Sequence, residues 1–198
     1  MSERYGAEIQ IGGVFDDRQA IRLCELIRNT RVELSWGEGV YLPNSAEQLR
    51  EACVEIDGVN VLRLCDEQAR WGEFSDIETF LRQEQLPFRR YSEGDYSCSP
   101  ELVYECPGLV RKTIVTNLDR QPVIITAGVE QVLVKLAQAT AARSKIRRAT
   151  LFSVVRQAVR QLRELLPGPV PPLVPFAIRS AQKSPASPAS GRRQRLAK

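Results

Sequence analysis

The sequence of 198 residues contains no histidine. Histidine is the commonest general base in proteins and a frequent zinc ligand. Its absence therefore excludes Ser-His and Cys-His catalytic pairs and most zinc sites. No stretch carries another catalytic signature. We therefore favour a non-enzymatic protein, and we expect no catalytic residue, no metal ligand and no cofactor.

Close pairs of cysteine are also absent. The five cysteines are irregularly spaced and form no Cys-x-x-Cys pair, so a zinc site made of cysteines alone is not expected. Cys24 and Cys53 fall on the apolar faces of predicted helices, where a free thiol behaves as a small hydrophobe. We predict reduced, structural cysteines in a reducing cytosol. The five residues are Cys24, Cys53, Cys65, Cys98 and Cys106.

Long hydrophobic runs are missing as well. Arg, Gln or Pro interrupts the apolar stretches well before the ~20 residues that a membrane-spanning helix needs. The first residues, Met1-Ser2-Glu3-Arg4, are not followed by the apolar run of a secretory signal. We therefore expect a cytoplasmic protein without a transmembrane segment. Its hydrophobic content of 43% is sufficient for a buried core.

Acidic residues are scarce in the second part of the chain. The whole chain has a formal net charge of +4. Residues 1–110 contain 11 Lys and Arg against 21 Asp and Glu, a balance of −10. Residues 111–198 contain 17 against 3, a balance of +14. An asymmetry of this size indicates an interaction arm or tail.

The N-terminal part predicts an α+β fold. A capping residue, Asp16 or Asp17, opens a first helix, and capping boxes at Asn44/Glu47 and Ser75/Glu78 open two more. This order favours a mixed or mostly antiparallel sheet with helices on one face, and two strand–helix–strand units are compatible with a ferredoxin-like duplication. The predicted helices span about 16–29, 44–56 and 75–86. The predicted strands span 7–11, 32–36, 40–42, 59–65, 88–91, 102–106, 111–116 and 123–126, and the two units span about 7–36 and 59–91.

The C-terminal part predicts two helices and then an irregular tail. Apolar stripes begin at Val129 and at Leu151, and Pro167 ends the second one. The Pro-rich residues 167–175 predict an extended spacer that holds the tail away from the body. The tail lacks acidic and most apolar residues, so we expect it to be disordered. The predicted parts are an acidic α/β domain (1–127), basic amphipathic helices (128–166) and a Pro-rich spacer with a disordered basic tail (167–198).

The candidate binding residues are basic. Arg156, Arg160 and Arg163 follow the i, i+4, i+7 spacing of one helix face, opposite the apolar stripe. Such a row can neutralise the phosphates of a nucleic acid or another polyanion. Aromatic residues for base stacking are not interleaved, so we expect contacts mainly to the backbone. The candidates are Arg143, Lys145, Arg147, Arg148, Arg156, Arg160, Arg163, Arg192, Arg193 and Arg195.

Other interpretations of the same residues remain open. The basic helix could dock on its own acidic domain, on a second copy or on another protein, which would make the chain an adaptor or structural protein, and its oligomeric state is open. The helix could also lie on an anionic membrane. The carboxylates of 66–78 suggest a metal-dependent enzyme as a third alternative. Gly12-Gly13 lacks the remaining residues of a phosphate-binding loop, so a tight turn is the better interpretation.

Overall fold

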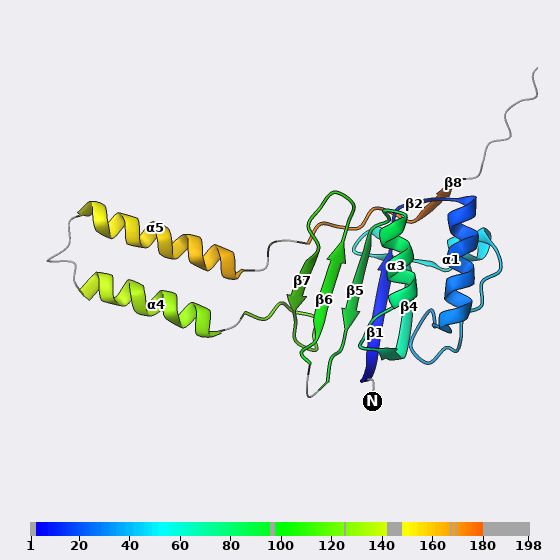
Figure 1. The fold of residues 1–198 in the computed structure, drawn as a ribbon, viewed down its shortest axis with the longest axis horizontal. Coiled ribbons are helices and arrows are strands. Elements are labelled where there is room, and N and C mark those ends of the chain that lie inside the picture. Colours follow the sequence, from blue (N-terminus) through cyan, green and yellow to red (C-terminus); the bar gives the residue numbers. More distant parts are fainter. Residues whose placement is uncertain are drawn as a thin grey trace, which may run out of the picture.

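The body of the protein is a six-stranded antiparallel sheet with helices on one face (Figure 1). The computed structural model describes residues 3–95, 98–124, 126–141, 148–166, 168 and 170–179. This architecture confirms the predicted α+β class with a mostly antiparallel sheet. From edge to edge the strands are β3 (Cys53–Ile56), β4 (Val59–Arg70), β1 (Arg4–Ile11), β5 (Phe88–Ser92), β6 (Glu101–Glu105) and β7 (Lys112–Val115).

Four of these strands and two helices have the ferredoxin-like arrangement. Along the chain they run β1, α1 (Asp17–Thr30), β3, β4, α3 (Ser75–Gln83) and β5. In the sheet the strands lie in the order β5-β1-β4-β3, so each strand–helix–strand unit encloses a strand of the other unit. The second predicted unit, 59–91, matches β4-α3-β5. The first unit closes on β3 rather than on the predicted strand 32–36.

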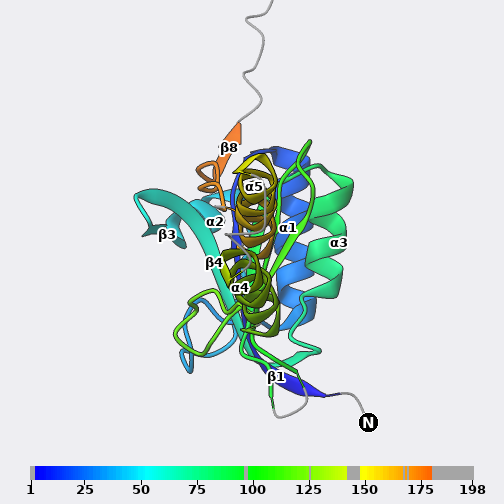
Figure 2. The same cartoon turned by 90° about the vertical axis from the view of Figure 1, so that its left-hand side faces the viewer.

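The core lies between the sheet and the helices α1 and α3 (Figures 1 and 2). Alternation in β1 directs Ala7, Ile9 and Ile11 into this core, where they are fully buried. Helix α1 supplies Leu23 and Ile27 to the same core. A capping box fixes the start of α1. The Asp16 side chain accepts a hydrogen bond from the Gln19 backbone N–H, and the Gln19 side chain accepts one from the Asp16 backbone N–H. The helix that the sequence predicts at 16–29 is therefore confirmed.

The segment 44–56 differs from the prediction of one helix. Helix α2 spans only Ala46–Glu51, and Ser45 rather than Asn44 accepts the capping bond, from the Gln48 backbone N–H. The following residues form β3, which pairs with β4 across the two-residue turn Asp57-Gly58. Both turn residues have positive φ, 54° and 76°, as a type I′ hairpin requires. An Asp-Gly hairpin signal therefore outweighed the apolar spacing that suggested a longer helix.

Three further predicted elements are changed in the structure. Residues 32–42 form two isolated bridges instead of a hairpin, one between Glu33 and Val40 and one between Glu33 and Cys65 of β4. Strand β4 continues to Arg70, beyond the end of the predicted strand 59–65, because its later residues also pair with β1. The predicted strand at 123–126 is replaced by a loop and the start of α4.

Residues 170–179, which we call the C-terminal strap, return to the body. Strand β8 (Ala177–Arg179) pairs in parallel with β2 (Val14–Asp16). The Phe176 ring lies 4.8 Å from the Phe15 ring, centroid to centroid, and both side chains are buried. The segment is extended, as its prolines dictate, but its apolar residues anchor it on the body, so it is not a free spacer. The tail that we expect to be disordered, after Arg179, lies outside the described residues.

The C-terminal strap packs against the backbone of Gly12 and Gly13. The Gly13 N–H donates to the Val174 carbonyl at 3.1 Å, and the Gly13 carbonyl accepts from the Ala177 N–H at 2.9 Å. A Cβ at position 12 would lie 2.1 Å from the Val174 carbonyl oxygen, a distance that no side chain can accept. The glycine pair therefore admits a neighbouring backbone, and the turn interpretation is preferable to a phosphate loop.

A helical hairpin projects from the body beyond β7 (Figure 1). Its helices α4 (Thr126–Ala141) and α5 (Arg148–Leu165) are antiparallel and pack on each other. Val132, Ala139 and Ala158 are buried between them. Within the described residues, no helix is both long enough and apolar enough to cross a membrane.

All five cysteines carry free thiols. Cys24 and Cys65 are buried, and Cys53 lies in β3 rather than on the predicted helix. Burial raises the pKa of Cys53 to about 11 and that of Cys65 to about 12. These thiols therefore stay protonated at neutral pH and pack as small apolar groups.

Candidate functional site

The arginine row consists of Arg156, Arg160 and Arg163 on α5. At ~100° per residue the three side chains leave the helix within an arc of about 60°, and all three are exposed. Arg160 Nε lies 3.2 Å from Glu164 Oε1, but both side chains are largely exposed, at 82% and 64%. Such a pair contributes little and is easily exchanged for another anion. The structure therefore places the three residues together, as the i, i+4, i+7 spacing predicts.

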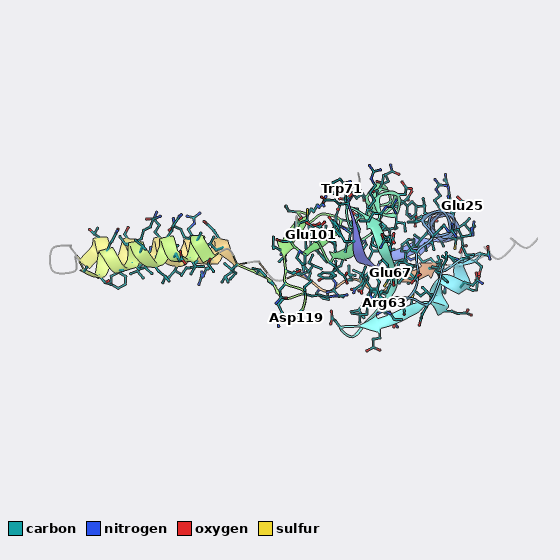
Figure 3. All side chains as sticks on the ribbon, turned by 90° about the horizontal axis from the view of Figure 1, so that it is seen from below. Glu25, Arg63, Glu67, Trp71, Glu101 and Asp119 are labelled. Atoms are coloured by element: carbon teal, nitrogen blue, oxygen red, sulfur yellow. The ribbon has the colours of Figure 1, made fainter. Side chains whose placement is uncertain are left out.

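The surroundings of the arginine row contain little compensating negative charge. Helix α5 packs on α4 and not on the acidic sheet, and Figure 3 shows the hairpin standing apart from the body. Glu130 and Glu164 are the only acidic residues of the two helices. The basic helix is therefore held away from the carboxylates of the acidic body.

The other candidate residues are placed less fully. Arg148 begins α5, and its side chain is outside the described part of the structure. The remaining six lie outside the described residues, so their prediction as binding residues stays a prediction. They are Arg143, Lys145, Arg147, Arg192, Arg193 and Arg195.

A charged cleft on the open face of the sheet escaped the sequence analysis. This cavity of about 270 Å³ lies opposite α1 and α3, and its floor includes Glu8 and Gln10 of β1. Arg120 Nη2 donates to Glu8 Oε2 at 3.0 Å, and the Arg120 guanidinium lies 4.4 Å from the Tyr91 ring centroid. Arg89 donates to Gln10 and to Asp57. The alternation of Glu8 and Gln10 with apolar residues was the one sequence signal for a polar face.

The cations of this cleft are already paired. Arg120 comes from the loop between β7 and α4, whose position Asp119 marks in Figure 3. Its bonds to buried Glu8 hold that loop on the sheet. These contacts in the cleft are therefore better explained as fixing the loop to the sheet than as an anion-binding site. The guanidinium groups of the arginine row, in contrast, are exposed to solvent.

The Glu8 pair predicts a loss of stability in acid. Burial favours the neutral acid, but hydrogen bonds from Arg120 and Gln10 outweigh it and hold the pKa of Glu8 below its ordinary value of 4.5. A carboxylate whose pKa is lower in the folded than in the unfolded state stabilises the fold at pH values above its unfolded-state pKa. This stabilisation is lost as the pH falls through the pKa of the folded state. We expect Glu8→Gln to cost about 1.5–3 kcal/mol at neutral pH. The difference from wild type should shrink below pH ~4.3.

Urea unfolding of both proteins between neutral pH and about pH 3 measures this difference. A constant difference across the acid range would contradict a charged Glu8 as its source. Asp76→Asn, at an exposed position of α3, is the matched control for removing a carboxylate.

The carboxylates between 66 and 78 do not converge on a metal site. Glu78 is 2% exposed and lies 3.0 Å from Arg90 Nε and 2.6 Å from Arg82 Nη2. Its Oε1 also accepts from the Phe74 backbone N–H at the start of α3. The predicted Ser75/Glu78 capping box is thus replaced by a Glu78 bond to Phe74, which is the N-cap and has no side-chain acceptor.

Arg90 completes a buried ion network with Glu78. Its guanidinium is 1% exposed, and it also contacts Glu101 Oε1 at 2.7 Å and the Gly72 carbonyl. The network joins α3 to the sheet, and its charges neutralise each other. Sequence spacing cannot reveal it, because Arg90 and Glu101 come from different strands. We therefore assign it to the fold and not to catalysis.

One group of potential metal ligands occurs among the described residues. Carboxylate oxygens of Glu3 and Asp95 and the Cys98 sulfur lie within 4.8 Å of one another. All three are near the surface, and each takes part in other interactions. We therefore do not assign a metal site to these three residues.

The chain matches no known protein family, no curated protein and no solved structure. The functional assignment therefore rests on the fold and on the charge and exposure of the α5 surface.

Proposed function

We propose that this is a non-catalytic binding protein that contacts a polyanion, in the first instance duplex nucleic acid, through the arginine row of α5. The observation that carries the proposal is the exposure of Arg156, Arg160 and Arg163 on a hairpin that projects from an acidic body. The free thiols of all five cysteines support a reducing compartment such as the cytoplasm.

Phosphate contact is the chemistry that suits this surface. Arginine guanidinium groups donate planar, often paired hydrogen bonds to phosphate oxygens and do not deprotonate. Exposed aromatic side chains for stacking on bases are absent from the row itself, so recognition would be mainly electrostatic. The basic tail, 183–198, would add affinity of the same kind. We therefore expect strong dependence on salt and weak dependence on base sequence.

Changing the arginine row should weaken polyanion binding in a salt-dependent manner. Each lost phosphate contact lowers the slope of log K against log salt by ~0.9, so the triple change of Arg156, Arg160 and Arg163 to Gln should lower it by about 3 for each arginine row that contacts the duplex. At ~0.15 M salt this corresponds to roughly a 10²-fold loss of affinity. Fluorescence anisotropy with a labelled random-sequence duplex, at four or more salt concentrations, measures both quantities.

A triple variant on the body provides the control. Changing Arg18, Arg70 and Arg111 to Gln removes three exposed arginines outside the hairpin. Like the first variant, it lowers the formal net charge from +4 to +1. Equal losses in the two variants would show that net charge alone drives binding, and no loss in the α5 variant would refute the assigned surface.

The adaptor hypothesis remains the second candidate. It is favoured by large apolar side chains that are exposed on the hairpin, among them Leu133 and Phe152. A single exposed apolar residue needs no explanation, but a continuous face does.

A further inference from the structure

Helix α5 carries two apolar rows. The first row is buried or half-buried against α4, and the second is exposed. At ~100° per residue the centre of the second row lies about 100° around the helix from the first. An isolated helical hairpin needs only the first row, whereas a helix with two adjacent rows is typical of a bundle with more helices. The first row is Leu151, Val154, Ala158, Leu162 and Leu165; the second is Phe152, Val155 and Val159, continued by Leu166 directly after the helix.

Helix α4 extends the exposed row into a face. Leu133 and Ala137 are exposed and lie about 100–160° around α4 from its buried residues Val132 and Ala139. On each helix the exposed row is displaced in the same rotational sense, along the N-to-C direction, from the residues that contact the other helix. Because the two helices are antiparallel, both exposed rows then lie on the same side of the hairpin. We call this side, with Leu133, Ala137, Phe152, Val155, Val159 and Leu166, the apolar face.

The opposite side of the hairpin is polar. Its exposed residues include Gln131, Lys135 and Gln138 on α4 and Ser153, Gln157 and Glu164 on α5. The hairpin as a unit is thus amphipathic. The side chain of Phe152 is 67% exposed and that of Leu133 is 55% exposed. Positions as exposed as these are normally occupied by polar residues. The contrast between the two sides indicates that the apolar face is covered by a partner.

The size of the apolar face suits a second copy of the chain. Helices of 16 and 18 residues are about 24 and 27 Å long, and two of them side by side are about 20 Å across. The face therefore measures ~500 Å² per copy, and a two-fold pair would bury ~1,000 Å², the lower bound for a specific interface. Because the face carries no charged residue at its centre, two identical faces meet without burying an unpaired charge.

We propose that two copies join through the apolar faces of their hairpins to form an antiparallel four-helix bundle. The body is wider than the hairpin and lies at its base (Figures 1 and 2). A two-fold axis perpendicular to the helices keeps the two bodies at opposite ends of the bundle. It also stacks α5 on the partner's α5, so the two arginine rows run along one edge and double the proposed polyanion surface.

Sedimentation velocity on the full chain tests this dimer. We expect a species of twice the 22.3 kDa monomer mass at concentrations above ~10 µM, because an interface near the lower bound of size should bind in the micromolar range. Leu133→Glu combined with Val159→Glu places carboxylates in the apolar face and should yield a monomer. Gln131→Glu combined with Gln157→Glu adds the same charge to the polar side and should remain a dimer.

Two further measurements separate this proposal from its rivals. Small-angle scattering of the dimer should show a second maximum in the pair-distance distribution, because ~27 Å of bundle separates the bodies. A wild-type protein that stays monomeric up to ~200 µM would overturn the dimer. If that monomer floats with vesicles of phosphatidylcholine and phosphatidylserine, and the Leu133/Val159 variant does not, the apolar face binds lipid instead.

The dimer and the polyanion surface can be tested separately. Changing Arg156, Arg160 and Arg163 to Gln should leave the dimer intact while weakening duplex binding. The Leu133/Val159 variant should be a monomer that keeps its own arginine row but lacks the partner's row, so its salt slope should be about half that of wild type. A monomer with an unchanged slope would separate the arginine row from dimerisation and overturn the shared edge.

Discussion

Replacing Arg90 with alanine should lower the free energy of unfolding by about 3–5 kcal/mol. Arg90 is 1% exposed, and its guanidinium lies 3.0 Å from Glu78 and 2.7 Å from Glu101. Its removal leaves the buried Glu78 carboxylate of α3 with the Arg82 guanidinium, at 2.6 Å, and the Phe74 backbone N–H as its partners. Removing one partner of a buried ion pair is among the most destabilising changes a fold can undergo, because the remaining charge is then less well compensated. Urea unfolding at neutral pH, followed by far-ultraviolet circular dichroism, measures the change.

Two controls distinguish the buried pair from ordinary ion pairs. Arg22→Ala breaks the exposed pair with Glu25 and should change stability by less than about 1 kcal/mol. Combining Arg90→Met with Glu78→Leu removes both charges and should restore much of the lost stability, because buried ion pairs are often no better than apolar pairs of similar volume. A cost for Arg90→Ala as small as that for Arg22→Ala would refute a buried network.

Phe176→Ala should destabilise the fold by about 3–5 kcal/mol. The side chain is 7% exposed and packs on Phe15, with the ring centroids 4.8 Å apart. Its loss leaves a cavity where the C-terminal strap meets the main core. The strap's hydrogen bonds to Gly13 and Asn60 hold the backbone but cannot fill that space. Thermal and urea unfolding of the full chain measure the effect.

The neighbouring residue provides the matched control. Val174 is in the same strap, but its side chain is 49% exposed, so Val174→Ala should have little effect. Truncation after Leu166 removes the strap and should destabilise the body at least as much as Phe176→Ala does. If the truncated chain unfolds at the wild-type urea concentration, the strap is not part of the core.

Patterns within short segments predicted several elements correctly. The capping box at Asp16 and the apolar spacing that follows it define α1. Strand β1 and the second strand–helix–strand unit followed from alternation and turn residues. The arginine row could be predicted for the same reason, because residues three and four apart on a helix share a face wherever that helix lies.

Contacts between distant segments changed other predictions. Residues 53–56 have apolar spacing that suits a helix, but β4 offers a pairing edge and the Asp57-Gly58 turn directs the chain onto it. The Pro-rich residues after 167 predict an extended spacer, but Phe176 is buried and packs against Phe15. Glu78 read as a helix-start residue, whereas its partner Arg90 is twelve positions away in another element.

The order of residues was enough to establish the α+β class, the division of charge and the arginine row on α5, because each depends on neighbours in the chain. The tertiary structure alone decided where these parts lie. It returned the C-terminal strap to the core, directed the hairpin away from the acidic sheet and left one side of that hairpin apolar and exposed. Such outcomes depend on which distant surfaces meet, since burial and charge pairing are properties of the assembled fold.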